Sequence, residues 1–170
     1  DLLVGNLECV ASPLGAPAIA ALPLRCPTPV LAVLAATGFD VLSVANNHAL
    51  DFGREAFADT LKLIEAQGVS HVGSEAMNAQ PEPVLLRRLG LLRVGLLAYY
   101  YPPAPPYLDV QRARAEVDLL VVYNHWGREG QREPIPQQRQ LARALIDAGV
   151  DLVVGSHAHV VQPLEQYGHG

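Results

Sequence analysis

Short apolar runs alternate along the chain with segments in which apolar residues recur every three or four positions. The runs predict buried β-strands, and the second pattern predicts amphipathic helices, because the two structures repeat with different periods. The sequence therefore predicts strands at residues 1–4, 40–45, 69–73, 117–123 and 151–154, and a hairpin of residues 84–88 and 91–98 around Leu89-Gly90.

Helical spacing occurs at residues 28–37, 54–67 and 137–148. The first of these helices is expected to begin with the Thr28 hydroxyl as its cap, followed by a proline. The apolar faces of the other two are Phe57, Leu61 and Ile64, and Leu141, Leu145 and Ile146, and the helices should end at Gly38, Gly68 and Gly149. A further short helix is expected at residues 111–116.

Two proline-rich segments interrupt these patterns. Residues 11–27 have no clear period and should form a long loop. Residues 99–106, with the sequence Y-Y-Y-P-P-A-P-P, cannot be helical and should form a loop or the edge of a sheet.

The order helix, glycine, apolar residue, aspartate, strand occurs twice, in residues 28–45 and 137–154. This order favours an α/β fold with central, mostly parallel sheets flanked by helices. The carboxyl ends of parallel strands then share one edge. The 170 residues suffice for one full core, so we expect a single domain over residues 1–170.

Composition narrows the class of protein. Half of the residues are apolar, 17% are charged and the net charge is -5, so the chain is globular and offers no basic patch for nucleic acid. It contains no apolar run of about 20 residues that would span a membrane. Cys9 and Cys26 could pair or remain free, and they do not form a disulfide framework or a cysteine metal motif.

Polar side chains with ligand chemistry follow four of the predicted strands. They are Asn6 and Glu8, then Asn46, Asn47 and His48, then His125, and finally His157 and His159. The carboxyl edge of an open α/β sheet is the usual position of a ligand site. Imidazole with amide and carboxylate oxygen suits Mn, Fe or Zn, and the absence of thiolate argues against a structural zinc site.

His157 and His159 are two residues apart. In an extended segment both rings would point the same way, and could serve one cation or two adjacent ones. Two cations about 3.5–4 Å apart could clamp an ester oxygen, with His48 free to act as an acid. The alternatives are structural: each histidine alone could serve packing, and Asn46 and Asn47 could simply turn the chain.

Three further residues are candidate substrate contacts. Arg128 could bind an anionic substrate or lie solvated on the surface, and Trp126 could form a wall of the site or pack in the core. Asn46 is the third candidate. Asp51 is expected to cap or brace the turn that carries His48.

Four motifs together resemble a known family: G-N-L-E, F-D-V-L-S-V-A-N-N-H-A-L-D-F-G, N-H-W-G-R-E and D-L-V-V-G-S-H-A-H-V-V-Q-P. The family is the bacterial capsule-synthesis family linked to poly-γ-glutamate, often called CapA or PgsA, and it is similar to the calcineurin-like metallophosphoesterases. The resemblance covers nearly the whole chain in order. It implies a layered, metallophosphoesterase-like α/β fold.

The resemblance also implies roles for individual residues. Asn47 would be a metal ligand and His48 the general acid. His125 would match the family's single histidine ligand, and His157 and His159 its Gly-His-x-His pair. Asn6 and Glu8 stand where the superfamily has a Gly-Asp motif, so Glu8 would replace the bridging aspartate. The cofactor implied is a divalent metal, Mn, Fe or Zn, as one ion or two.

The same resemblance leads us to expect a first aspartate motif before Asp1 and a closing strand after Gly170, so the chain would be a fragment of a longer one. It implies a metal-dependent hydrolase acting on a phosphoester or amide of an anionic polymer. The alternative is a non-catalytic accessory or polymer-binding subunit. Expected partners are the polymer or phosphoester and membrane synthase subunits. The expected location is extracytoplasmic, in the cell envelope, with an anchor preceding Asp1.

Overall fold

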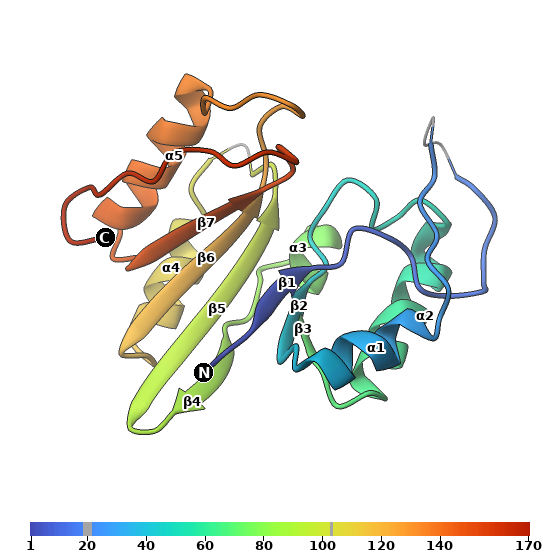
Figure 1. Cartoon of the computed structure of the whole chain (residues 1–170). Coiled ribbons are helices and arrows are strands. Elements are labelled where there is room, and N and C mark those ends of the chain that lie inside the picture. Colours follow the sequence, from blue (N-terminus) through green and yellow to red (C-terminus); the bar gives the residue numbers. More distant parts are fainter. Residues whose placement is uncertain (19–21, 103) are drawn as a thin grey trace. The chain divides into compact units, whose positions relative to one another are not determined.

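The strands form two sheets, and each belongs to a separate unit of the chain. The computed structural model describes residues 1–18, 22–102 and 104–170. Residues 1–74 form unit 1 and residues 75–170 form unit 2 (Figure 1). The α/β class predicted from the sequence is confirmed, and the prediction of one domain stays a prediction.

Unit 1 contains a parallel sheet with the order β1-β2-β3. Its strands are β1 (Val4–Asn6), β2 (Val41–Ser43) and β3 (Ser70–Val72), and β2 is fully buried between its neighbours. The strand predicted at residues 1–4 was placed too early. Leu3 lies outside the regular ladder, because its amide donates to the Asp40 carboxylate at 2.7 Å.

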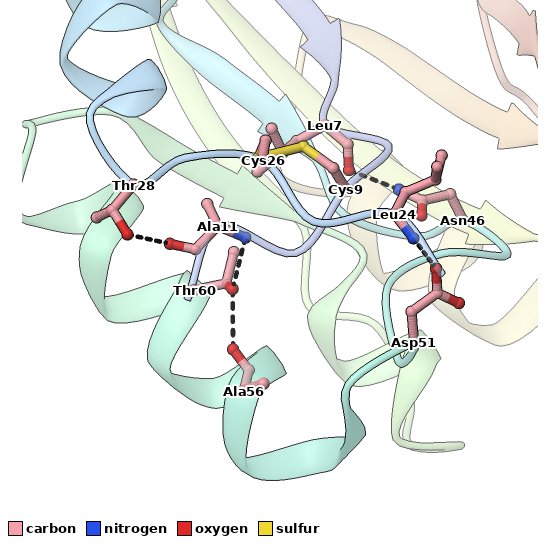
Figure 2. The surroundings of a disulfide bond; sticks show 10 residues. All are labelled: Leu7, Cys9, Ala11, Leu24, Cys26, Thr28, Asn46, Asp51, Ala56 and Thr60. Atoms are coloured by element: carbon pink, nitrogen blue, oxygen red, sulfur yellow. Dashed lines mark hydrogen bonds between the residues drawn. A yellow bond between two sulfur atoms is a disulfide. The ribbon is translucent and has the colours of Figure 1, made fainter. Parts of the chain in front are cut away.

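Two helices connect the strands of unit 1, α1 (Val30–Thr37) and α2 (Gly53–Glu65). The prediction that Thr28 caps α1 is wrong. Its hydroxyl donates to the Ala11 carbonyl at 3.0 Å and so tethers the long loop (Figure 2). Gly38 ends α1 with a left-handed φ of 95°, as predicted. The predicted apolar face of α2 is confirmed, with Phe57 and Ile64 buried and Leu61 partly buried.

Unit 2 contains a sheet with the order β4-β5-β6-β7. Its strands are β4 (Leu85–Leu89), β5 (Leu92–Tyr100), β6 (Leu119–His125) and β7 (Leu152–Ser156). The β4–β5 pair is antiparallel, which confirms the predicted hairpin, and the other pairs are parallel. A four-residue helix, α3 (Ser74–Met77), precedes this sheet.

Helices α4 (Tyr107–Arg114) and α5 (Pro136–Asp147) pack on one face of this sheet. Their contacts form a core with Leu97, Leu120 and Val122 from the strands. Tyr99 belongs to the same core, and its hydroxyl donates to Asp109 at 3.0 Å. Burial and the neighbouring Asp109 raise the pKa of Tyr99, so this hydroxyl stays protonated.

Several predicted bounds in unit 2 were shifted. The strand predicted at 117–123 ends at His125, and the helix predicted at 111–116 begins at Tyr107. The strand before the proline-rich segment continues through Tyr100. The loops predicted at 11–27 and 99–106 include residues 19–21 and 103, which lie outside the described residues.

Aspartates fix the amino ends of the parallel strands. Asp40, Asp118 and Asp151 each precede a strand. Each carboxylate accepts a hydrogen bond from a backbone amide near the start of the neighbouring strand, and the donors are Leu3, Arg93 and Leu120 respectively. Each aspartate amide also donates to the carbonyl of the same partner residue. Side-chain and backbone hydrogen bonds from Arg93 lower the pKa of Asp118 to about 2. These paired bonds set the register that brings the carboxyl ends together.

None of the helices among the described residues has the length and apolar character needed to cross a membrane.

Candidate functional site

In unit 1, Asn46 holds the turn that follows β2. Asn46 is fully buried, and its Nδ2 donates to the Leu7 carbonyl at 2.8 Å and to Asn6 Oδ1 at 3.2 Å. Its Oδ1 accepts the His48 amide at 3.1 Å. Asn46 therefore fixes the segment that carries Asn47 and His48, and a direct substrate contact by Asn46 stays a prediction.

His48 is oriented by a buried carboxylate. His48 Nδ1 lies 2.7 Å from Asp51 Oδ2, and the Asp51 side chain is only 3% exposed. A carboxylate can only accept, so Nδ1 carries the proton and Nε2 is the ring atom available for proton transfer. The same Asp51 oxygen accepts the Leu24 amide at 2.7 Å. The prediction that Asp51 braces this turn is confirmed.

Asn6 and Glu8 project to the same side of the β1 end, as the strand geometry predicted. Asn6 Nδ2 donates to Glu8 Oε2 at 2.9 Å. Asn6 is also tied to Asn46, and both Glu8 and Asn47 are half-buried. Unit 1 thus presents amide and carboxylate oxygens at the carboxyl ends of β1 and β2, beside the oriented imidazole of His48.

In unit 2, three histidines gather at the carboxyl ends of β6 and β7. His125 is the last residue of β6 and pairs in register with Ser156, the last residue of β7. The ring centroids of His125 and His157 are 4.6 Å apart, and those of His157 and His159 are 6.1 Å apart. We call His125, His157 and His159 the histidine cluster. The prediction that His125 and His157 share one edge is confirmed.

His125 is held in one orientation by Ser156. His125 is fully buried, and its Nδ1 lies 3.0 Å from Ser156 Oγ. Ser156 Oγ also donates to the Asn124 carbonyl at 3.5 Å. Its oxygen is therefore placed to accept a hydrogen bond from His125 Nδ1. A hydrogen bond of this kind leaves Nε2 unprotonated, which is the form of the nitrogen that can bind a metal.

The backbone at His157 and His159 is not extended. The prediction that alternation along a strand points both rings the same way is therefore wrong. Both residues have left-handed φ values, 90° for His157 and 53° for His159. Between them Ala158 is buried, and its carbonyl accepts the Gly130 amide at 2.8 Å. A turn brings the rings together, and their ligand atoms lie within 4.8 Å of each other. Such conformations cost about 1–3 kcal/mol each and concentrate at functional sites.

The histidine cluster fits a metal ion. His157 Nδ1 is buried and has no hydrogen-bond partner among the residues that the structure describes. An unpaired buried polar atom is costly, and a cation would satisfy its lone pair. Neutral imidazole nitrogen is a common ligand of Zn, Mn and Fe, so the donor set agrees with the chemistry predicted from the sequence.

The predicted substrate contacts Trp126 and Arg128 follow directly after β6. Trp126 is 7% exposed and packs over Gly155, where an added Cβ would lie 2.7 Å from the indole Nε1. This packing agrees with the core alternative, and a contact of Trp126 with substrate stays a prediction. Arg128 is exposed. Its substrate role stays a prediction.

Sequence reasoning missed three residues beside these groups. Ser156 and Tyr100 occupy register positions next to His125, and the Tyr100 ring centroid lies 6.0 Å from that of His125. These two residues are recognisable only from their pairing with His125, and this pairing requires the register of the strands. Leu24 contributes only its backbone amide, so no side-chain pattern could reveal it.

Comparison with known proteins identifies the family. Residues 1–107 and 104–170 match the family model described as "Bacterial capsule synthesis protein PGA_cap". The chain belongs to this family. The resemblance noted from the motifs is thereby confirmed.

The relatives include two Bacillus proteins with capsule names. The chain is 32% identical over 154 residues to the PGA biosynthesis protein CapA of Bacillus subtilis, covering 79% of this chain and 40% of that protein. It is 32% identical over 155 residues to the capsule biosynthesis protein CapA of Bacillus anthracis, covering 78% and 38%. The chain thus spans about two fifths of the length of these curated relatives.

A more distant relative is named as an accessory protein. The chain is 28% identical over 156 residues to the "Probable polyglutamine synthesis accessory protein" Rv0574c of Mycobacterium tuberculosis, covering 75% of this chain and 41% of that protein.

Two solved structures share the fold. A hypothetical protein from Thermus thermophilus superposes with a TM-score of 0.57 at 18% identity, over 94% of this chain and 57% of that one. A Staphylococcus aureus protein assigned as a 5'-nucleotidase gives 0.51 at 16% identity, over 75% and 30%. The fold of the PGA_cap chain is metallophosphoesterase-like, as the motifs implied.

Proposed function

We propose that this chain carries the metal-dependent hydrolase site of a protein that acts on a capsule polymer. The observation that carries the proposal is the histidine cluster, in which the buried His157 Nδ1 has no hydrogen-bond partner among the described residues and could bind a cation. Backbone strain at His157 and His159 adds support, because a purely structural turn would favour glycine at such φ values.

In unit 2, His125, His157 and His159 would supply imidazole nitrogen as metal ligands. In unit 1, Asn6, Glu8 and Asn47 would supply oxygen as metal ligands. A bound divalent cation, one or two of Mn, Fe or Zn, would act as a Lewis acid on the oxygen of the scissile bond. Ser156 would keep His125 in its ligand tautomer, and Asn6 would hold the Glu8 carboxylate.

His48 is the proposed general acid. In its imidazolium form the ring would donate its Nε2 proton to the leaving group. The Nδ1 proton would stay on the ring, hydrogen-bonded to Asp51 Oδ2. A buried carboxylate that accepts from a catalytic imidazole both orients the ring and stabilises its charged form. Asn46 keeps the His48 backbone in place during this transfer.

The proposed substrate is an anionic polymer such as poly-γ-glutamate, or a phosphoester formed during its synthesis. The capsule and PGA names of the Bacillus relatives support this class. Arg128, exposed beside the end of β6, is the proposed anion contact. Membrane synthase subunits are the proposed partners. An extracytoplasmic location is proposed because the Cys9–Cys26 disulfide is typical of oxidising compartments.

The experiment combines metal analysis of the whole protein with turnover. Purified protein should contain one or two divalent ions per chain and should hydrolyse a member of a panel of phosphoesters and poly-γ-glutamate. Chelation should abolish turnover, and re-addition of Mn, Fe or Zn should restore it. Bound metal without turnover on any substrate would favour the accessory, polymer-binding alternative. Absence of metal from protein prepared with added Mn, Fe and Zn would contradict the metal centre itself.

A further inference from the structure

The disulfide between Cys9 and Cys26 closes a loop that reaches the His48 turn. The two Cα atoms are 5.8 Å apart, within the usual range for a disulfide. Beside it, the Val10 amide donates to the Leu24 carbonyl and the Cys26 amide donates to the Val10 carbonyl, each at 3.0 Å. Figure 2 shows the disulfide with Leu24 directed at Asp51. The crosslink therefore fixes the position of Leu24.

Leu24 and His48 share one acceptor atom. The Leu24 amide and His48 Nδ1 each lie 2.7 Å from Asp51 Oδ2, and Asp51 is buried. The side chain of Asp51 thus has one donor from the disulfide-closed loop and one from the proposed acid. A carboxylate held at two points has a fixed direction, and so does the imidazole bonded to it.

Arg25 reinforces this contact from the same loop. Its guanidinium lies 3.8 Å from the centroid of the Phe52 ring, next to Asp51 in the chain. It also donates to the carbonyls of Pro13, Leu14 and Gly15. The loop has no helix or regular strand among its described residues, so the disulfide and these contacts keep it in place.

We infer that the Cys9–Cys26 disulfide positions His48 by holding the Leu24 amide against Asp51, and that reducing this disulfide lowers turnover. The inference rests on the hydrolase function proposed above. A dithiol would break the sulfur–sulfur bond by supplying two electrons and two protons, giving two cysteine thiols and the disulfide of the reductant. Leu24 would then leave Asp51, and the His48 ring would lose its fixed orientation.

The test uses ¹⁵N signals of the His48 ring in the whole protein, together with kcat and KM. Oxidised protein should show a protonated Nδ1 and an unprotonated Nε2 in the neutral ring. Dithiol treatment and the C9S/C26S variant should move both signals toward the average of the two tautomers. Turnover should fall by roughly 10–100-fold in kcat, with KM and bound metal unchanged, because orientation and not binding is lost.

Leu24→Pro removes the amide donor while the disulfide stays intact, so it decides the question if C9S/C26S fails to fold. The matched control is Leu14→Pro in the same loop. Leu14 also follows a proline, and its amide donates to Ser12 Oγ at 3.1 Å instead of to Asp51. Leu24→Pro should reproduce the effect of reduction, and Leu14→Pro should keep the oxidised ring signals.

Unchanged His48 ring signals in either the reduced protein or Leu24→Pro would overturn the inference. A wild-type protein without turnover would instead count against the proposed hydrolase function, and the ring signals would still decide whether the disulfide positions His48.

Discussion

Replacing His157 with alanine should remove most of the bound metal from the protein. Its buried Nδ1 has no hydrogen-bond partner among the described residues, and its ring centroid lies 4.6 Å from that of His125 and 6.1 Å from that of His159. Loss of a ligand should weaken metal binding by more than roughly 10–100-fold, which is the usual cost of losing a residue that hydrogen-bonds to a ligand. Metal content per chain, measured after dialysis against a weak chelator, gives the result.

His71→Ala is the matched control for this measurement. His71 Nδ1 is also buried without a hydrogen-bond partner among the described residues, but His71 lies in β3 and pairs with Glu65 at 3.1 Å. The control therefore separates the histidine cluster from a lone buried imidazole. Equal metal loss in both variants would contradict the assignment. Acidification should release metal from the wild type, because protons compete for the imidazole nitrogens.

Replacing His48 with alanine should lower turnover by roughly 10²–10⁴, the usual contribution of a general acid. Metal content should stay at the wild-type level, because His48 is bonded to Asp51 and is not a proposed ligand. Asp51 keeps the Leu24 amide as a donor, so the variant should remain folded. Turnover, metal content and melting temperature are measured on the same preparation. Wild-type turnover in His48→Ala would remove His48 from the mechanism.

The sequence predicted the elements of the fold well because each depends on local patterns. Phe57 and Ile64 recur at helical spacing, and Gly38 marks the end of α1 by its left-handed conformation. Strand bounds were less accurate. The first and last ladder residues depend on the partner strand, as the pairing of Asp40 with Leu3 illustrates.

The candidate site was predictable only as a set of side-chain types at strand ends. The convergence of His157 and His159 was correct, yet it arises from a turn around buried Ala158, which alternation along a strand cannot reveal. The sequence did not decide whether Cys9 and Cys26 form a disulfide, because two cysteines alone do not define a pairing. The orientation of Asp51 required the loop that this bond closes.

The central claim is that the strand-end residues are metal ligands, Glu8 of unit 1 as well as the histidine cluster of unit 2. Metal content of Glu8→Gln, compared with wild type and His157→Ala, tests it most directly. Glutamine keeps an oxygen that can accept from Asn6 and removes only the negative charge. If Glu8 is a ligand, Glu8→Gln should lose metal, as His157→Ala does. Full metal content in Glu8→Gln, with His157→Ala depleted, would contradict the claim.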